Sequence, residues 1–338
     1  MTLKALLVGA GGMGRAWAKM MRYCDDVHIG GWVDVQADLA AQGADELKLS
    51  NLYTGTDFEQ ALAGVQPDFV VDVTIPEAHH NVTIASLTAG VPVLGEKPMA
   101  DSMEHARAMV AASERAEVLY MVSQSRRYNA QLHALRRFID TRIGRLGILN
   151  SDFYIGAHFG GFRDKMPSPL ILDMAIHTFD AARFLSNADP VAVYCEEFNP
   201  SWSWYKGDAC ATALFEMTDG LRYTYRGSWC SEGCHTSWEG EWRAVGSYGS
   251  AVWDGSTAPQ AAVVQQRGGF FSETESQTME PEPDFVEGIE GALRDFLRAL
   301  KTGATPMGEC HDNIKSLAMV FGAIESAQTG QRVILSQL

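Results

Sequence analysis

The stretch Leu3-Lys-Ala-Leu-Leu-Val-Gly9-Ala-Gly11-Gly12-Met-Gly14 decides the fold of the first part of this chain. An apolar run ends in a glycine turn, a helix-like segment follows, and a second apolar run, Val27–Val33, comes next. Gly9 permits the tight turn, Gly11 lets the backbone approach a pyrophosphate, and Gly14 lets the helix pack against the strand. The pattern predicts a dinucleotide site at the helix N-terminus, where free N–H groups hold phosphates.

An acidic residue closes the second strand. Asp34 lies 20 residues past Gly14 (34 − 14 = 20), close to the position from which a carboxylate accepts hydrogen bonds from the adenosine ribose. A carboxylate there repels a 2′-phosphate, and neither Val35 nor Gln36 supplies an arginine to attract one. The sequence therefore favours NAD over NADP.

Length and composition bound the architecture and the partners. A chain of 338 residues, 46% of them hydrophobic, can build large cores and exceeds one typical domain, so two domains are expected. The formal charge is −15, from 27 basic and 42 acidic residues, and the sequence pI is near 5.0. Nucleic acid binding needs a clustered basic surface, so this balance argues against a nucleic-acid partner.

Targeting and membrane signals are not evident. No cationic and apolar leader precedes the first strand, and no apolar run approaches the roughly 20 residues of a spanning helix. We therefore expect a cytoplasmic protein with no membrane partner and with reduced thiols. Cys230-Ser-Glu-Gly-Cys234-His235 lacks the paired CxxC pattern of a metal site, so no metal is expected and buried or strand cysteines are favoured.

Strand and helix patterns alternate up to about residue 122, which indicates an α/β fold with a parallel sheet covered by helices on both faces. Such a sheet binds its ligand beyond the carboxyl ends of its strands. The expected strands are Ala5–Val8, His28–Val33, Phe69–Val73, Pro92–Leu94 and Leu119–Val122. The expected helices are Arg15–Arg22, Ala37–Leu47, Asp57–Leu62, His80–Ala89 and Ser102–Ala116.

The pattern changes after residue 123. Two strand-like segments joined through Thr-Asp-Gly predict a hairpin, so we expect an α+β domain with a large open antiparallel sheet and helices on one face. Gly255–Pro283 is expected to be a loop with one short strand near Ala261–Gln265. The other expected strands are Leu146–Tyr154, Val191–Phe198, Ala209–Met217, Leu221–Trp229 and Glu241–Val245, and the expected helices are Asn129–Asp140, Leu170–Leu185, Asp284–Leu300 and His311–Thr329.

Further polar signals fall at strand ends of the first domain. Phe69–Val73 leads to Thr74 and His79, and the next strand leads into Glu96-Lys97-Pro98. A lysine just past a buried strand is positioned to face the cofactor, and a Lys-Pro bond is a candidate for the cis form. Taken alone, Lys97 is more simply interpreted as a surface lysine in a loop.

A third signal lies in the second domain. Asp173, His177 and Asp180 are separated by four and three residues in an otherwise apolar helix, so they share one face. Burying two carboxylates and an imidazole costs free energy unless they have partners. From the spacing alone, a satisfied core network and an active site are equally open interpretations.

Together these motifs resemble the Gfo/Idh/MocA family of sugar and polyol dehydrogenases. The resemblance covers nearly the whole chain, but Ile75 departs from it, because relatives usually carry proline directly after the threonine and here proline comes at Pro76. It implies an NAD-binding Rossmann domain, a doubly wound parallel sheet, over residues 1–123. It also implies an α+β domain for substrate binding and oligomerisation over residues 124–338, and its last helix is a candidate to pack back on the first domain.

The resemblance implies hydride transfer between NAD and a secondary alcohol of a cyclic polyol or sugar, such as an inositol or an aldopyranose. His177 would be the acid/base, a task that suits a side chain titrating near neutral pH. Lys97 would stabilise alkoxide-like charge and Asp173 would bind a substrate hydroxyl, whereas Asp180 would support the helix. The implied cofactor-binding residues are Gly9, Gly11, Gly12, Met13, Gly14, Asp34, Thr74, Ile75, His79, Glu96 and Lys97.

Substrate contacts are expected mainly in the second domain. Six of the eight tryptophans lie between Trp202 and Trp253, which suits a sugar-stacking wall or, as we favour, a sheet face buried in a homodimer or homotetramer. The expected substrate-binding residues are Lys97, Arg127, His158, Asp173 and His177, with Arg126, Tyr128, Phe159 and Arg163 nearby in the sequence.

Two other functions stay open at this stage. A sugar-modifying enzyme could hold NAD tightly and return the hydride within one catalytic cycle. A regulator could bind the dinucleotide without turnover, although the presence of Lys97, Asp173 and His177 together argues against it. The identity and stereochemistry of the sugar or polyol are not specified by the sequence, because loop side chains select them.

Overall fold

A computed structural model describes residues 2–36 and 38–337, and the chain divides into two compact units. The first unit comprises Met1–Ser125 and Gly288–Ile314, and the second comprises Arg126–Glu287 and Lys315–Leu338. The first crossing lies close to the expected boundary after residue 123. The last helix was expected as a candidate to pack back on the first domain. Only its start, within the returning segment Gly288–Ile314, belongs to the first unit, so the last long helix, α9 (Cys310–Thr329), is divided between the two units.

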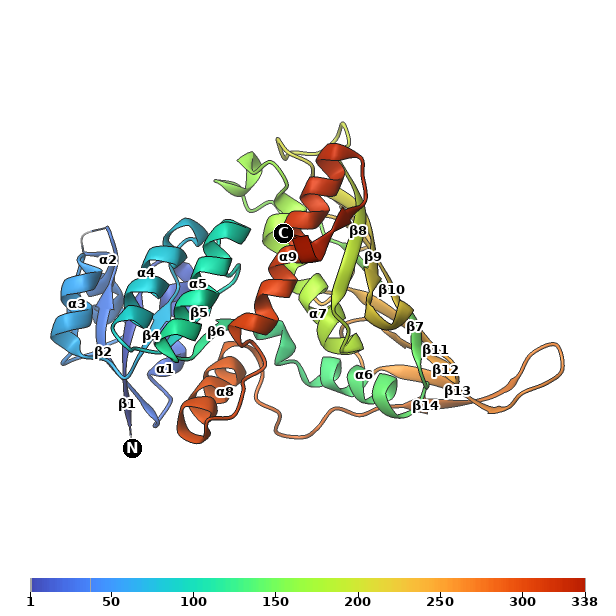
Figure 1. Ribbon diagram of the computed structural model, residues 1–338, viewed down its shortest axis with the longest axis horizontal. Helices are drawn as coiled ribbons and strands as arrows, with labels where there is room; N and C mark the ends of the chain where they lie inside the picture. Colours follow the sequence, from blue (N-terminus) through green and yellow to red (C-terminus); the bar gives the residue numbers. More distant parts are fainter. Residues whose placement is uncertain (1, 37, 338) are drawn as a thin grey trace. The chain divides into compact units, whose positions relative to one another are not determined.

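The first unit contains a six-stranded parallel sheet with the order β3-β2-β1-β4-β5-β6 (Figure 1), which is the doubly wound arrangement of dinucleotide-binding folds. Its strands are β1 (Leu3–Val8), β2 (Val27–Val33), β3 (Tyr53–Gly55), β4 (Phe69–Asp72), β5 (Val93–Glu96) and β6 (Tyr120–Ser123). Its helices are α1 (Gly12–Met21), α2 (Leu39–Glu46), α3 (Phe58–Val65), α4 (Pro76–Thr88), α5 (Met103–Ala116) and α8 (Gly288–Thr302).

The parallel sheet confirms the predicted fold class, and the differences are local. The sequence did not predict β3, which at three residues is too short to show a period. Helix α4 begins at Pro76 rather than His80, because proline has the backbone angle of a first helical turn and lacks only an N–H that would be unpaired there. The expected start of the second helix at Ala37 lies outside the described residues.

The second unit is built on a nine-stranded sheet with the order β14-β13-β12-β11-β7-β10-β9-β8-β15. Its neighbouring strands are antiparallel except for β7 and β10, which are parallel, so the expectation of an antiparallel sheet is corrected to a mixed one. The predicted hairpin of β9 and β10 is confirmed. The strands are β7 (Leu146–Tyr154), β8 (Pro190–Phe198), β9 (Cys210–Met217), β10 (Arg222–Ser228), β11 (Glu241–Gly246), β12 (Gly249–Trp253), β13 (Gln260–Gln266), β14 (Glu273–Thr278) and β15 (Val333–Ile334).

Helices cover one face of this sheet. Helix α6 (Ala130–Thr141) starts at Asn129, whose side chain accepts a hydrogen bond from Leu132 N–H at 2.9 Å. Phe179 of α7 (Ile176–Ser186) packs on Phe215 and Tyr225 of the sheet, with ring centroids 4.8 and 5.2 Å apart. The opposite face, which we call the open face, carries the alternate side chains of the same strands.

Strands β13 and β14 form a hairpin that projects from the sheet edge (Figure 1). The sequence predicted a loop with one short strand here, and that prediction was wrong for β14. The reason is that β14 is the polar segment Glu-Thr-Glu-Ser-Gln-Thr, which has no apolar alternation and is held by backbone pairing with β13. We call residues 260–278 the arm.

Candidate active site

The glycine loop after β1 has the geometry that the sequence predicted. Gly9 has a φ of +103°, and a Cβ atom on it would lie 2.6 Å from the Val73 carbonyl oxygen. A Cβ atom on Gly14 would collide with the Gly9 carbonyl, so helix and turn pack in direct contact. Trp32 Nε1 donates to the Gly9 carbonyl oxygen at 2.9 Å and fixes the turn from the neighbouring strand. Only glycine fits these two positions.

The two remaining glycines of the loop border open space. A Cβ atom on Gly11 or Gly12 would meet no atom within 4 Å. Gly11 is the N-cap of α1, so the first N–H groups of that helix lie beside this space, and the first turn carries no acidic residue. Met13 is exposed at the same helix start. The loop therefore offers an anion the cradle that a pyrophosphate needs.

Asp34 follows β2 and lies next to the glycine loop. Its Oδ2 accepts a hydrogen bond from Ala10 N–H at 2.7 Å, and its Oδ1 accepts one from Gln36 N–H at 2.8 Å. A carboxylate oxygen can accept more than one hydrogen bond, so the half-buried group can also accept from ribose hydroxyls. The predicted position of the acid beside the loop is confirmed.

A buried network supports the loop after β4. Asp72 accepts hydrogen bonds from Thr74 Oγ1 at 2.6 Å and contacts His79 Nδ1 at 2.9 Å. Burial lowers the pKa of His79, but the charge and hydrogen bond of Asp72 raise it, and the net pKa lies above its ordinary value. His79 is only 1% exposed, so it positions the loop from beneath rather than contacting a cofactor as predicted. Ile75, by contrast, is exposed on this loop.

The Glu96-Lys97-Pro98 motif follows directly after β5, and the Lys97–Pro98 peptide bond is cis, as anticipated. Glu96 is buried and accepts a hydrogen bond from Trp17 Nε1 of α1 at 2.7 Å. Burial raises the pKa of Glu96, and the Trp17 hydrogen bond opposes that rise. Glu96 therefore ties α1 to the strand end and is not a direct cofactor contact. Lys97 is half-buried at the carboxyl end of the sheet.

These observations fit a dinucleotide. Gly11 and Gly12 border open space at the loop. Met13 and Ile75 are exposed nearby, and Asp34 lies at the end of the neighbouring strand. The buried residues Asp72, His79 and Glu96 hold those segments in place. The predicted set of cofactor-binding residues thus separates into positions that border open space or are exposed and buried positions that support them.

In the second unit, the helix expected over Leu170–Leu185 has two parts. Leu170–Ala175 forms a π-helix, and α7 continues from Ile176. Asp173 lies in the π-helix and His177 in the first turn of α7, so the single α-helical face inferred from the spacing is interrupted. Sequence spacing cannot show this, because α and π turns have the same composition. Single-turn π segments are frequent at functional sites.

Asp173 has a cationic neighbour from a preceding loop. Arg163 Nε donates to Asp173 Oδ2 at 2.5 Å, and the Arg163 guanidinium lies over the rings of Phe159 and Phe162, 5.1 and 4.7 Å from their centroids. A second guanidinium, that of Arg126, lies 3.7 Å from the Met174 sulfur. Burial lowers the pKa of Arg126, and Glu239 opposes this effect. The π-helix therefore lies between two guanidinium groups.

Asp180 belongs to a different environment from Asp173. It is buried, and its two oxygens accept hydrogen bonds from Arg127 Nε and Nη2, each at 2.7 Å. Ser316 Oγ of α9 also donates to Asp180 at 2.7 Å and accepts from Arg183 at 3.0 Å. The network supports the interpretation of Asp180 as a residue that holds the helix. It also opposes the prediction that Arg127 binds substrate, because its guanidinium is buried against Asp180.

One buried acid near this segment was missed. Glu197, at the end of β8, accepts a hydrogen bond from Ser168 Oγ at 3.0 Å, and burial raises the pKa of Glu197 to about 7. Nothing in the sequence distinguishes Glu197 from the exposed Glu196 beside it. Its burial is a product of tertiary packing.

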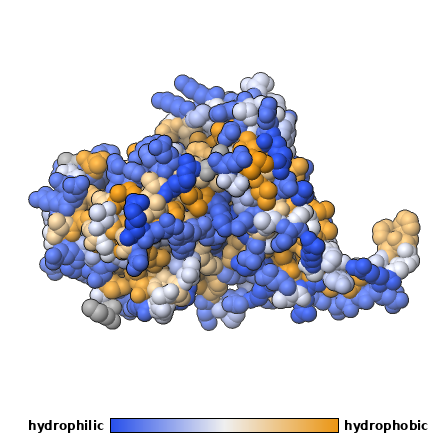
Figure 2. All heavy atoms as spheres, viewed as in Figure 1, coloured by the Kyte–Doolittle hydropathy of each residue, from blue (hydrophilic) through white to orange (hydrophobic). Residues whose placement is uncertain are grey.

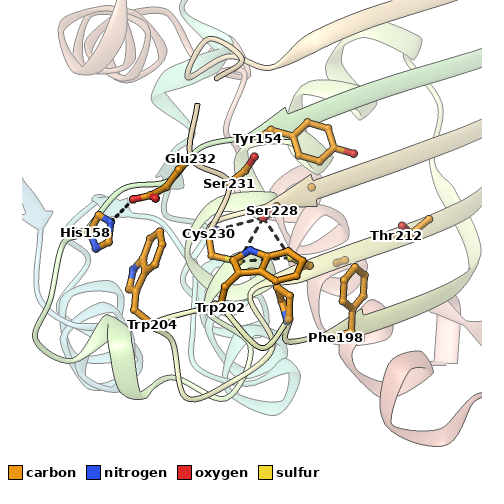
Figure 3. Close-up of a pocket in the computed structure, with 14 residues that line it drawn as sticks. Tyr154, His158, Phe198, Trp202, Trp204, Thr212, Ser228, Cys230, Ser231 and Glu232 are labelled. Atoms are coloured by element: carbon orange, nitrogen blue, oxygen red, sulfur yellow. Dashed lines mark hydrogen bonds and ion pairs between the residues drawn. The ribbon is translucent and has the colours of Figure 1, made fainter. Parts of the chain in front are cut away.

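His158, Trp202 and Trp204 are among the residues that line a cavity of about 710 Å³ on the open face (Figure 3). His158 stacks on Trp204 with ring centroids 3.7 Å apart and contacts Glu232 at 2.9 Å. Asp173 and His177 do not line this cavity, so the structure does not bring His158 to them as predicted. Trp229, Trp242 and Trp253 are buried, whereas Trp202 and Trp238 are exposed, so the tryptophans do not form one wall.

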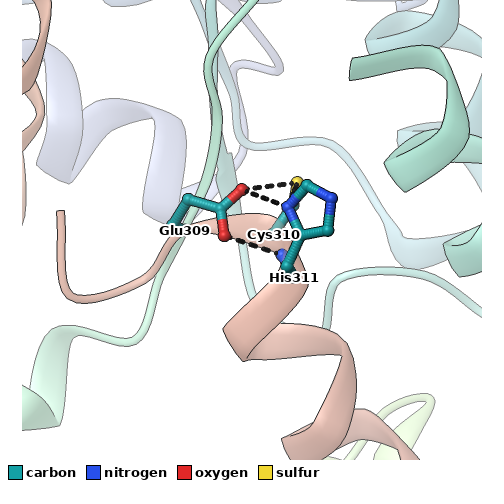
Figure 4. A group of neighbouring side chains, drawn as sticks. All are labelled: Glu309, Cys310 and His311. Carbon is teal, nitrogen blue, oxygen red and sulfur yellow. Dashed lines mark hydrogen bonds and ion pairs between the residues drawn. The ribbon is translucent and has the colours of Figure 1, made fainter. Parts of the chain in front are cut away.

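Among the residues that the structure describes, metal-ligating side chains gather at one further place. Glu309, Cys310 and His311 bring three ligand atoms within 4.8 Å of one another at the start of α9 (Figure 4). However, Glu309 accepts from His311 N–H at 3.0 Å as a helix cap, and a helix N-terminus repels cations. Burial raises the pKa of the Cys310 thiol far above its usual range, so the sulfur is a poor ligand. Cys230 is buried as expected, but Cys234 is exposed, which contradicts the prediction for that residue.

Comparison with known proteins decides the family. Residues 3–124 match the model described as an oxidoreductase family with an NAD-binding Rossmann fold, and residues 163–335 match the C-terminal alpha/beta domain of the same family. The chain belongs to the Gfo/Idh/MocA oxidoreductase family. Its first unit is therefore an NAD-binding Rossmann domain, and the protein is an NAD-dependent oxidoreductase.

Several relatives of this Gfo/Idh/MocA protein match over its whole length. An inositol 2-dehydrogenase of Streptomyces avermitilis is 32% identical, over 98% of this chain and 94% of that protein. A D-apiose dehydrogenase of Paraburkholderia graminis is 26% identical, over 99% and 90%. The fold is shared with a crystal structure of an Agrobacterium radiobacter oxidoreductase in complex with NAD+, L-tartaric acid and magnesium, at a TM-score of 0.87, 21% identity and coverage of 100% and 99%.

Proposed function

We propose that this protein transfers a hydride between a secondary alcohol of a cyclic polyol or sugar and NAD. The observation that carries the proposal is the position of an acid/base candidate, His177, four residues after Asp173 across a π-to-α junction, in a chain that also holds an NAD loop and Lys97. The names of the inositol and D-apiose dehydrogenases support polyols and sugars as the substrate class.

We assign to His177 the transfer of the hydroxyl proton. NAD, when bound, supplies the hydride acceptor, and the alcohol must lose its hydroxyl proton as the hydride leaves. An imidazole is a suitable base because it titrates near neutral pH. Its mostly buried position limits competing hydrogen bonds from water. In the reverse direction the same ring returns the proton.

We assign Lys97 to stabilising charge on the alcohol oxygen and Asp173 to orienting the substrate. The Lys97 ammonium would stabilise negative charge that develops on the alcohol oxygen as its proton leaves. Asp173 would accept a hydrogen bond from a substrate hydroxyl, and its contact with Arg163 orients the carboxylate. Arg127, His79 and Glu96 are proposed as positioning residues only, since each is engaged in a buried contact.

The proposal extends to the oligomeric state and the cellular location of the protein. We expect a homodimer or homotetramer that uses the sheet of the second unit, because its open face carries exposed Ile148, Tyr194 and Leu214. The six cysteines have free thiols, which supports a reducing, cytoplasmic location. Among the described residues, every helix is too short or too polar to cross a membrane.

The proposal is tested by measuring turnover of a panel of substrates by the wild-type protein and by the His177→Ala variant. Inositols, hexoses, pentoses and sugar acids are offered with NAD and NADP in parallel, and the absorbance of the reduced cofactor is followed. We expect turnover of a polyol or sugar with NAD, and a loss of roughly 100-fold or more in His177→Ala with unchanged NAD binding. Near-normal turnover in that variant would refute the role of His177.

Other outcomes of the panel distinguish other functions. Cofactor that copurifies with the protein and no net reduction of added NAD would indicate an enzyme that returns the hydride internally. NAD binding with no turnover of any compound would indicate a regulator. A strong preference for NADP would overturn the interpretation of Asp34.

A further inference from the structure

The tip of the arm exposes two aromatic side chains. Phe270 and Phe271 are 94% and 81% exposed, and their rings pack edge to face with centroids 4.8 Å apart. Figure 2 shows the projecting arm ending in hydrophobic atoms beyond a hydrophilic stem. Adjacent, fully exposed phenylalanines at the end of a hairpin are unusual on a soluble surface and mark a contact site.

The outer strand of the arm is uncovered, whereas its inner strand β13 pairs with β12 and buries Ala261. Of the six residues of β14, all but Gln277 are exposed, so neither face of this edge strand is covered. A hairpin without a packed face is only marginally stable in water, and an unpaired edge invites association. The arm therefore has the properties of a segment that is ordered by a partner.

A complementary cavity lies on the open face of the same unit (Figure 3). Strand pairing aligns Phe198, Cys210, Ser228 and Tyr154 in one row across β8, β9, β10 and β7. This row forms the floor and two sides of the 710 Å³ cavity, and Trp202 and Trp204 form its wall. Tyr154, Phe198, Trp202 and Trp204 are its aromatic lining residues, most of the others are small, and its one carboxylate is Glu232, at the rim. The cavity thus offers an apolar, aromatic site with an acidic edge.

Tip and cavity lie at diagonally opposite corners of the sheet. Strand β13 runs antiparallel to β7, so the tip projects near the beginning of β7, whereas the cavity lies at Tyr154, where β7 ends. The arm leaves from the β14 edge, and the cavity spans β7 to β8 toward the other edge. The tip of one chain is therefore placed away from its own cavity.

A second copy removes this separation. Consider a two-fold axis along the sheet diagonal that joins the two remaining corners. Two copies related by this axis pack their sheets face to face, with strands that cross near 90°. This operation places the tip corner of each copy opposite the cavity corner of the other. The contact then occurs twice, as in any two-fold interface.

We propose that Phe270 and Phe271 of one copy insert into the aromatic cavity of a second copy. The charges agree with this pairing, because Arg267 is the one charged residue in the tip segment 266–272 and the cavity rim carries Glu232. In the separate chain Arg267 donates to the Ser247 carbonyl and Glu232 contacts His158, so each would exchange or share that partner on association. The occupant is thus a second copy of this chain, and the cavity is an assembly site rather than a substrate site. The inference is independent of the reaction proposed above.

Photocrosslinking tests the contact directly. Benzoylphenylalanine replaces Phe271 in the full chain, and isotopically light and heavy copies are mixed before irradiation. We expect crosslinks between a light and a heavy copy, from residue 271 to segment 198–204 or 228–232. Crosslinks within one copy, crosslinks to other segments, or no crosslink would each overturn the proposal.

A second measurement tests the energetic role of the tip. The double variant Phe270→Ser/Phe271→Ser should weaken self-association by roughly ten-fold or more in sedimentation, because buried aromatic anchors dominate interfaces. Tyr23→Ser, at an exposed aromatic residue of the first unit, is the matched control and should leave association unchanged. Association of the double variant at the wild-type strength would overturn the proposal, whether or not the enzyme is active.

Exchanging the charges of Arg267 and Glu232 tests whether these two residues meet in the interface. Arg267→Glu should weaken association, and Glu232→Arg in the same chain should restore part of it. If Glu232→Arg weakens the Arg267→Glu variant further, the rim of the cavity is not the contact of the arm.

Discussion

Individual side chains in this protein divide into those that border open space and those that support them. Gly11, Gly12 and Asp34 lie at the surface of the NAD loop, whereas Asp72 and His79 lie beneath the neighbouring loop. The two classes are expected to respond differently to substitution. Changes to contact residues alter binding of NAD, whereas changes to supporting residues also alter stability.

Glu197 provides a prediction about pH. Burial raises its pKa to about 7 in the folded protein, above the ordinary value of 4.5. The folded state therefore holds a proton that the unfolded state releases, so this group stabilises the fold fully below pH 4.5 and loses that contribution as the pH rises toward 7. We expect Glu197→Gln, which keeps an acceptor for Ser168, to remove this part of the pH dependence.

The measurement is the free energy of unfolding in urea between pH 5 and pH 8. Wild type should lose stability relative to Glu197→Gln across this interval, and the difference should level off above pH 7. Glu196→Gln, at the exposed neighbour, is the control and should follow the wild-type curve. Parallel curves for wild type and Glu197→Gln would show that Glu197 does not titrate in this range.

Sequence reasoning reached the residues whose roles follow from chain-local rules. Gly9 and Gly14 were predicted because a tight turn and a close helix contact demand glycine, and Lys97 because it follows a strand. Glu197 and the Arg163–Asp173 pair were not predicted, because burial and ion pairing depend on segments brought together by the fold. The wrong assignment of Arg127 has the same origin.

At the scale of secondary-structure elements, the Arg127–Asp180–Ser316 network joins α7 to α9 in the second unit. Replacing Asp180 by Asn leaves the buried Arg127 guanidinium without its charge partner. Loss of one partner of a buried ion pair typically costs about 3–5 kcal/mol of stability. We expect Asp180→Asn to lower the free energy of unfolding by an amount in that range.

A matched exposed pair is available as the control. Arg226 and Asp152 form an equally bidentate contact on the open face, at 2.7 and 2.5 Å, with Arg226 exposed. Exposed pairs contribute at most about 1 kcal/mol, so Asp152→Asn should have little effect. Equal losses in the two variants, measured by denaturant unfolding, would show that burial does not govern the Asp180 pair.

Elements with a strong period were predictable, and those without one were not. The strands of the parallel sheet and the hairpin of β9 and β10 followed from apolar runs and turn residues. Strand β14 was missed because its side chains are polar and exposed on both faces. The π-helix was missed because one widened turn does not change the amino-acid composition of the segment. The parallel pairing of β7 with β10 depends on topology rather than on either strand alone.

At the scale of the whole molecule, the first unit is discontinuous in sequence. Helix α8 packs Phe296 on Phe69 of β4, with ring centroids 5.5 Å apart, and Val122 N–H donates to the Gly308 carbonyl at 2.7 Å. We therefore expect a fragment of residues 1–125 to fold poorly and bind NAD weakly. Fusing residues 288–314 to it through a flexible glycine-serine linker should restore binding.

Calorimetric titration measures the affinity of both fragments for NAD. A fusion of residues 1–125 to the same linker without residues 288–314 is the control. Equal NAD affinity of the fragment with and without residues 288–314 would show that α8 is dispensable for the dinucleotide site.

The discontinuity also governs when the protein can fold during its synthesis. A ribosome releases residues 1–125 of the first unit first, but α8 and the start of α9 emerge only after residues 126–287 have been made. The second unit waits as well, because β15 pairs with β8, and Ser326 Oγ accepts a hydrogen bond from Cys195 N–H at 2.9 Å. The first unit therefore closes only after residue 314 and the second only after β15 has been made, so a premature stop before α8 deprives both units of an essential piece.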